Sequence, residues 1–148
     1  MKADSLTSLN SVVSANSAEN GGAIDMTVSD LEIRRSTITG NTATNQGGAI
    51  YSDRGGEANI VDSVITGNSA RQGGVAFAQY ARLNIRSSTI SGNSSTERGA
   101  VVYGSYSRTL VEDSMITGSQ GSTVISDRTA LGGAPQTSVT ISRSTITG

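Results

Sequence analysis

The phrase that decides the fold is Ser36-Thr-Ile-Thr-Gly-Asn41, because close copies of it recur along the chain. The copies begin 25 to 30 residues apart, which is the period of a solenoid built from stacked coils. They read Ser63-Val-Ile-Thr-Gly-Asn68, Ser88-Thr-Ile-Ser-Gly-Asn93, Ser114-Met-Ile-Thr-Gly-Ser119 and Ser144-Thr-Ile-Thr-Gly148, with a weaker copy at Ser11-Val-Val-Ser-Ala-Asn16.

A second phrase precedes the first in most coils, and around both phrases apolar and polar residues alternate. The period of two predicts strands, with Ile33, Ile38 and their equivalents pointing inward and the residues between them pointing outward. The Gly-Asn pair that ends each copy predicts a bend, because Gly and Asn tolerate positive φ better than other residues. The second phrase reads Gly21-Gly-Ala-Ile24, Gly47-Gly-Ala-Ile50 and Gly73-Gly-Val-Ala76.

These patterns predict an all-β fold, a single-stranded right-handed parallel β-helix of about five to six coils of roughly 26 residues. We expect one domain over residues 1–148, with an irregular or partial first coil over 1–20 and a loop insertion in the last coil over 127–136. Stacking brings equivalent side chains into columns along the axis. One column, Asn16, Asn41, Asn68 and Asn93, is expected to form an amide ladder.

The composition excludes several classes of partner and site. Eleven basic and twelve acidic residues balance to a net charge of −1, which favours neither nucleic acid nor an anionic membrane. Cys and His are absent, so disulfides, thiolate metal sites and the commonest general base are absent too. No apolar run approaches the ~18 residues of a membrane span. Without evident capping segments, the chain is expected to be a piece of a longer solenoid or to stack head to tail on copies of itself.

The two phrases are similar to repeats of bacterial right-handed β-helix surface proteins, of which the chlamydial polymorphic outer-membrane proteins are the best-known case. In those proteins a Gly-Gly-Ala-Ile phrase is followed by Phe-x-x-Asn, whereas this chain has Ile38-Thr-Gly-Asn41 in place of the Phe phrase. The resemblance implies an exported passenger or adhesin region, and therefore an extracellular or cell-surface location with a carbohydrate or host surface as partner. It implies the fold more strongly than the function, because β-helices host several activities.

An array of hydroxyl groups flanks the central aliphatic residue of each copy of the first phrase. These side chains are expected on one flat outer face, which resembles the ice-binding face of solenoid antifreeze proteins. The alternative is that β-branched Thr simply suits a strand. The candidate residues of this ligand or ice face are Thr37, Thr39, Thr66, Thr89, Ser91, Thr117, Thr145 and Thr147.

A charged column precedes the repeated Ser and contains Arg35, Asp62, Asp113 and Arg143. Pairs such as Arg35–Asp62 and Asp113–Arg143 predict a surface charge ladder that avoids stacking like charges. The alternative is carbohydrate catalysis, since Asp62 and Asp113 are expected about 10 Å apart, near the upper limit for the two carboxyl groups of inverting glycosidases.

No residue set suggests a cofactor or a metal site, although calcium on scattered carboxylates stays open without a nominated site. Tyr80, Tyr103 and Tyr106 are candidates either for an aromatic patch or for the coil interior. Without His and without a convergent catalytic set, the chain favours a non-enzymatic structural or adhesive role over an enzyme. Ice binding and a carbohydrate-active lyase or hydrolase are the alternatives, and the sequence does not identify a ligand.

Overall fold

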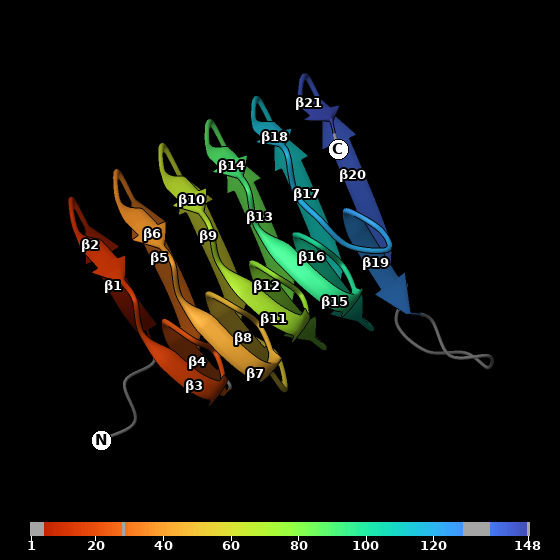
Figure 1. The fold of residues 1–148 in the computed structure, drawn as a ribbon. Helices are drawn as coiled ribbons and strands as arrows, with labels where there is room; N and C mark the ends of the chain where they lie inside the picture. Colours follow the sequence, from red (N-terminus) through yellow and green to blue (C-terminus); the bar gives the residue numbers. More distant parts are fainter. Residues whose placement is uncertain (1–4, 28, 129–136, 148) are drawn as a thin grey trace.

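The computed structural model describes residues 5–27, 29–128 and 137–147, and its regular elements are all β-strands. The strands wind into a parallel solenoid of about five coils, and successive coils follow one another along the axis in chain order (Figure 1). Each complete coil contributes one strand to each of four parallel sheets. None of the described residues forms a helix that is long and apolar enough to cross a membrane.

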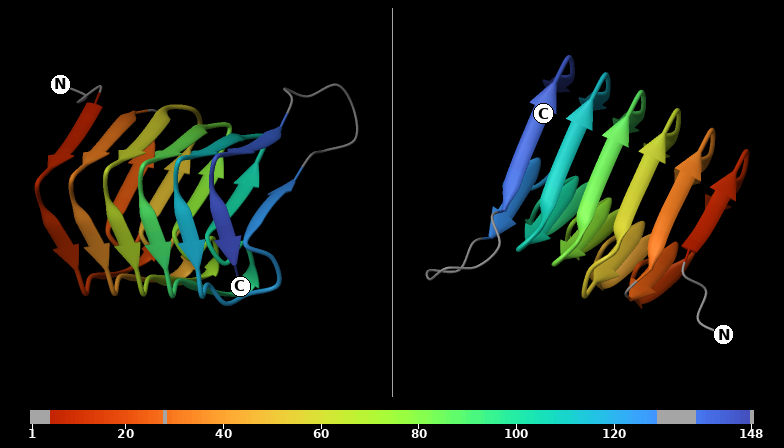
Figure 2. Two further views of the ribbon diagram at one scale, coloured as in Figure 1. Left: turned by 90° about the horizontal axis from the view of Figure 1, so that it is seen from above. Right: turned by 180° about the vertical axis from the view of Figure 1, so that it is seen from behind.

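The first two sheets each contain six strands and lie next to each other around the coil. The long strands of the first sheet run side by side in Figure 2, and neither sheet has a register shift. The first sheet consists of β1 (Ser5–Leu9), β5 (Asp30–Arg34), β9 (Glu57–Val61), β13 (Arg82–Arg86), β17 (Arg108–Glu112) and β20 (Ser138–Ser142). The second consists of β2 (Val12–Ser14), β6 (Thr37–Thr39), β10 (Val64–Thr66), β14 (Thr89–Ser91), β18 (Met115–Thr117) and β21 (Thr145–Thr147).

The third and fourth sheets close each coil. The third sheet contains register shifts, whereas the fourth is regular. The third consists of β3 (Ser17–Asn20), β7 (Thr42–Gln46), β11 (Ser69–Gln72) and β15 (Ser94–Arg98). The fourth consists of β4 (Ile24–Thr27), β8 (Ile50–Asp53), β12 (Ala76–Gln79), β16 (Val102–Ser105) and β19 (Ile125–Arg128).

The core is the predicted set of aliphatic columns. Ile38, Ile65 and Ile90 are fully buried on the second sheet, and Ile33 and Ile60 are fully buried on the first. In the last coil the equivalent Ile141 is 46% exposed, because no described strand pairs with the far edge of β20. Burial of apolar surface inside the solenoid is therefore the main stabilising contribution, as the period-two pattern predicted.

Two polar columns are also buried, and they hold the coils in register. The side-chain oxygen of each repeated Ser accepts from the backbone N–H of the preceding Ser, as Ser36 N does to Ser63 Oγ at 3.2 Å. The hydroxyl itself donates to the carbonyl two residues earlier, for instance Ser63 to Val61 at 2.7 Å. The expected amide ladder is confirmed from Asn16 through to Asn93.

Backbone conformation at the corners differs from what we expected. The residue before each ladder Asn has positive φ, whether it is Gly, as at Gly40, or Ala15 in the first coil, so the predicted bend is present. The residues before the repeated Ser also have positive φ, including Arg35 at 48° and Asp62 at 51°. The charged column therefore turns the chain between the first and second sheets, a role that Gly or Asn would fill with less strain.

The first coil is more regular than expected. Residues 5–20 form β1, β2 and β3, because each can pair with an equivalent strand of the next coil. In the last coil, residues 127–128 belong to β19, and the remaining residues of the expected insertion, 129–136, lie outside the described residues.

Candidate functional site

The predicted hydroxyl array forms the outer face of the second sheet. Its two columns run in register from β2 to β21, and Ser91 Oγ donates to Thr66 Oγ1 at 3.2 Å. The face carries no charged side chain, and Val64 and Met115 expose 41% and 46% of their surface within it. All eight nominated residues lie here: Thr37, Thr39, Thr66, Thr89, Ser91, Thr117, Thr145 and Thr147.

The charged column forms only part of the predicted ladder. Arg143 pairs with Asp113 at 2.6 Å and with Glu112 at 2.5 Å. Arg35 donates its Nε–H to Asn10 Oδ1 at 2.9 Å, and among the described residues it makes no ion pair with Asp62. The Arg35–Asp62 pair is therefore not formed, because the corner conformation directs the Arg35 side chain toward the preceding coil.

The electrostatic environment of Asp113 in this column argues against a role for its carboxyl group as a general acid. The Arg143 guanidinium hydrogen-bonds to Asp113 and lowers the pKa of that carboxyl, and the two acidic groups in turn raise the pKa of Arg143. An acid catalyst needs the opposite shift, toward a raised pKa. Asp62 and Asp113 are exposed, and Ser87 occupies the coil between them. The column accordingly has the properties of a surface ion pair.

A groove that the sequence did not reveal runs along the outer face of the fourth sheet. Its floor contains Phe77 and Tyr103, whose rings lie at 5.6 Å with a tilt of 48°. The Tyr51 ring of the preceding coil stacks on Phe77 at 5.4 Å and continues the aromatic column beyond the groove. Its wall comes from the ends of β7, β11 and β15, where Gln46 Nε2 donates to Gln72 Oε1 at 3.1 Å. The volume is about 390 Å³.

Phe77 and Tyr103 are only 3% and 5% exposed, so the groove offers mainly polar groups to a ligand. Beyond the groove, one coil further toward the N-terminus along the same sheet, Asp25 lies in register with Tyr51. Desolvation, and then the charge of Asp53, raise the pKa of Asp25. Desolvation, and then the charges of Asp53 and Asp25, also raise the pKa of Tyr51. The sequence left open which side chains of the Gly-Gly-Ala-Ile strand face outward. In the structure Ile50 points inward and Tyr51 points outward, which places the aromatic column on the outer face of the sheet.

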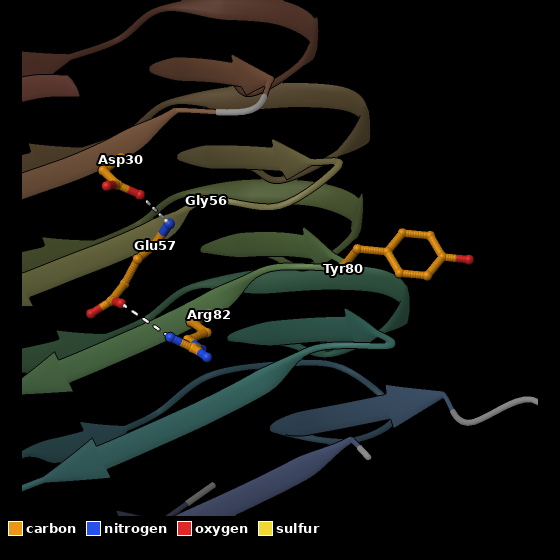
Figure 3. Close-up of a pocket in the computed structure, with 5 residues that line it drawn as sticks. All are labelled: Asp30, Gly56, Glu57, Tyr80 and Arg82. Carbon is orange, nitrogen blue, oxygen red and sulfur yellow. Dashed lines mark hydrogen bonds and ion pairs between the residues drawn. The ribbon is translucent and has the colours of Figure 1, made fainter. Parts of the chain in front are cut away.

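A second hollow of about 410 Å³ lies at the corner where the fourth sheet leads into the first (Figure 3). Asp30 Oδ1 accepts from the Glu57 backbone N–H at 2.8 Å, and Glu57 Oε2 lies 3.8 Å from Arg82 Nη1. The Tyr80 ring points away from these groups into solvent, and it stacks on Tyr106 at 4.9 Å with an angle of 7° between the rings.

Of the three candidate tyrosines, two come together and one does not. Tyr80 and Tyr106 form the exposed pair, whereas Tyr103 belongs to the groove floor with Phe77. The sequence does contain a signal for this pair. It is the repeated Tyr-x-Arg spacing in Tyr80-Ala-Arg82 and Tyr106-Ser-Arg108. Within the described residues, no group of three or more acidic side chains gathers as a metal site.

The fold agrees with a comparison against protein families. A family model described as "right handed beta helix region" matches residues 22–148, which agrees with the hand predicted from sequence. No curated protein and no solved structure matches the chain.

Proposed function

Because the chain belongs to the family of right-handed β-helix regions, we propose that it is a non-enzymatic structural or adhesive module of a secreted or cell-surface bacterial protein. The observation that carries this proposal is the pair of buried ladders. Ser and Asn side chains link the neighbouring coils by hydrogen bonds between residues 25 to 30 positions apart. A scaffold braced in this way holds its outer columns at fixed spacing, which is what a binding or spacer surface requires.

The distribution of charged side chains favours a binding surface over a catalytic one. Two acidic side chains at or near the corners are engaged in ion pairs, Asp113 with Arg143 and Asp53 with Arg54 at 3.4 Å. The outer face of the second sheet is uncharged, and the groove wall combines amide groups with one acidic and one basic side chain. Such surfaces suit reversible contact with a carbohydrate or a host surface.

Adhesion of beads that carry the purified chain tests this proposal. We expect beads with folded chain to adhere to host cells, and beads with heat-unfolded chain to adhere no more than uncoated beads. In parallel, the chain is incubated with acidic and neutral polysaccharides, and we expect no new reducing ends and no unsaturated products. Turnover of any polysaccharide would refute the non-enzymatic role, and equal adhesion of folded and unfolded chain would refute the adhesive one.

Self-association is part of the same proposal. Leu6 on β1 and Val139 and Ile141 on β20 continue the inward columns, yet they are 41% to 48% exposed. A second copy stacked head to tail would cover these side chains and pair the two free sheet edges. Sedimentation velocity is expected to show oligomers that grow with concentration and that Ile141→Lys reduces to monomer. A wild-type chain that stays monomeric at high concentration would contradict stacking.

Ice binding is a second candidate, favoured by the uninterrupted register and lack of charge on the second sheet. Thermal hysteresis of the wild-type chain measures it directly. We expect Thr89→Lys, in the middle of the face, to abolish the hysteresis, and Asn84→Lys, on the outer face of β13, to leave it unchanged. Absence of hysteresis in the wild type, or equal hysteresis in both variants, would exclude ice binding.

A further inference from the structure

Two consecutive coils repeat the same pair of side chains at the corner between the fourth and first sheets. We call Tyr80, Arg82, Tyr106 and Arg108 the Tyr–Arg corner. The two arginines are paired in register as the first residues of β13 and β17. The two tyrosines stack one coil apart. The corner therefore presents two rings and two guanidinium groups at the spacing of neighbouring strands.

The tyrosines occupy a conformation that bulky residues avoid. Tyr80 has φ of 51° and Tyr106 has φ of 54°, whereas the left-handed region favours Gly and Asn. Burial does not compensate for this strain at Tyr80, which is 50% exposed. The turn itself requires positive φ, as at Arg35 and Asp62, but it does not require a large ring in that position. Strained residues that stability does not explain concentrate at functional sites.

The positions of Arg82 and Arg108 are also unfavourable for the stability of the fold. Like charges directly opposite each other in a sheet repel. At the other end of β13, Arg86 faces Glu112 of β17 and pairs with it at 3.2 Å. Arg82 faces Arg108 on that side and Glu57 on the other, where the ion pair is loose at 3.8 Å and the Arg82 side chain is 62% exposed. Among the described residues Arg108 is exposed without an ion pair.

The shape of the corner favours a protein as its partner. Sites for small ligands and sugars are concave, with polar groups that converge on the ligand. Arg82 borders the hollow described above, but the Tyr80 ring projects out of it, away from Glu57 and Arg82, as Figure 3 shows. Protruding Tyr and Arg side chains are the residue types that anchor protein–protein interfaces, where they enter pockets on the partner.

We propose that the Tyr–Arg corner binds an acidic protein surface. Carboxylates of the partner pair with Arg82 and Arg108 and relieve their mutual repulsion, while the Tyr80 ring enters an apolar pocket between those carboxylates. This inference rests on the proposed adhesive function and assigns it to one edge of the solenoid.

Binding of the full chain to a random copolymer of glutamate and tyrosine, measured by biolayer interferometry, tests the inference. Arg82→Gln combined with Arg108→Gln is expected to weaken binding about tenfold or more, because interface anchors carry most of the affinity. Tyr80→Asn is expected to weaken it several-fold without lowering the melting temperature, since Asn tolerates positive φ. Arg34→Gln combined with Arg86→Gln removes the same two positive charges elsewhere on the first sheet and should leave binding unchanged.

Each contrary outcome has a definite meaning. Binding of the copolymer that is insensitive to the Arg and Tyr substitutions would overturn the assignment to this corner. Tighter binding of polygalacturonate through the same residues would replace the acidic protein by an acidic glycan. The bead assay separates the two proposals: adhesion unaffected by the corner variants keeps the adhesive function and refutes this inference, whereas copolymer binding without cell adhesion refutes the adhesive function only.

Discussion

Asn41 and Asn68 are 27 residues apart in sequence, yet one oxygen joins them inside the solenoid wall. Asn68 Oδ1 accepts from the Asn41 backbone N–H at 2.9 Å and from Asn41 Nδ2 at 3.0 Å. Asn68 Nδ2 in turn donates to the Ile38 and Thr66 carbonyls and to Asn93 Oδ1. The amide thus satisfies polar groups of three coils at once, all of them shielded from water.

Replacement of Asn68 by Ala should strongly destabilise the fold. The change leaves the buried Asn41 backbone N–H without its Asn68 acceptor and removes the Asn68 amide bonds to Ile38 and Asn93, and we expect a loss of about 3 kcal/mol in the free energy of unfolding. Asn45→Ala is the matched control, because Asn45 makes one half-buried amide contact with Asn20 at 3.1 Å. Its cost should stay below about 1 kcal/mol in chemical denaturation. Equal costs for the two variants would contradict the role of the ladder.

The ladder ends at Ser119, where the equivalent residue is too short to continue it. Ser119 is 8% exposed, and its Oγ has no partner among the described residues. We expect Ser119→Asn to extend the ladder to Asn93 and to stabilise the chain by about 1 kcal/mol. Ser119→Ala, which only removes the unpaired hydroxyl, should change stability less. A destabilised Asn variant in urea denaturation would show that the last coil cannot hold a further amide.

Gly48 should not tolerate any side chain. A Cβ at this position would lie 2.1 Å from the Gly74 carbonyl oxygen, so the backbone of the next coil would have to move. We expect Gly48→Ala to cost roughly 3 kcal/mol or more. Gly92→Ala provides the comparison, because its Cβ would meet nothing within 4 Å and only its φ of +60° opposes Ala, at about 1–2 kcal/mol. Thermal melting of both variants measures the difference, and a melting temperature for Gly48→Ala at or above that of Gly92→Ala would contradict it.

Asp25 should make stability depend on pH. Desolvation and the nearby Asp53 raise its pKa in the fold above the ordinary value of 3.8. The folded state therefore favours the protonated form, and this contribution is present below pH 3.8 and is lost as the pH rises through the raised pKa. Asp25→Asn should raise the melting temperature at neutral pH, and the gain should disappear in acid below pH 3.8. A gain that is the same at every pH would point to a cause other than ionisation.

The coil, its period and its inward columns could all be predicted from local sequence. Ile38, Ile65 and Ile90 could be placed inside from the alternation of apolar and polar residues, because each strand obeys a local period of two. The amide ladder followed from the same repeat, since residues one period apart must stack. The outward direction of Thr37 and Thr39 followed from parity alone.

The atoms that meet between coils and at the corners could be identified only in the three-dimensional fold. The repeated Ser proved to be buried, the corner residues take positive φ, and Arg35 contacts Asn10 rather than Asp62. The groove over Phe77 and the exposed Tyr80–Tyr106 stack likewise join residues from different coils. A repeat specifies which positions stack, whereas the reach and direction of each side chain depend on backbone angles at the bends and on neighbours about 25 residues away, and neither is expressed in local sequence.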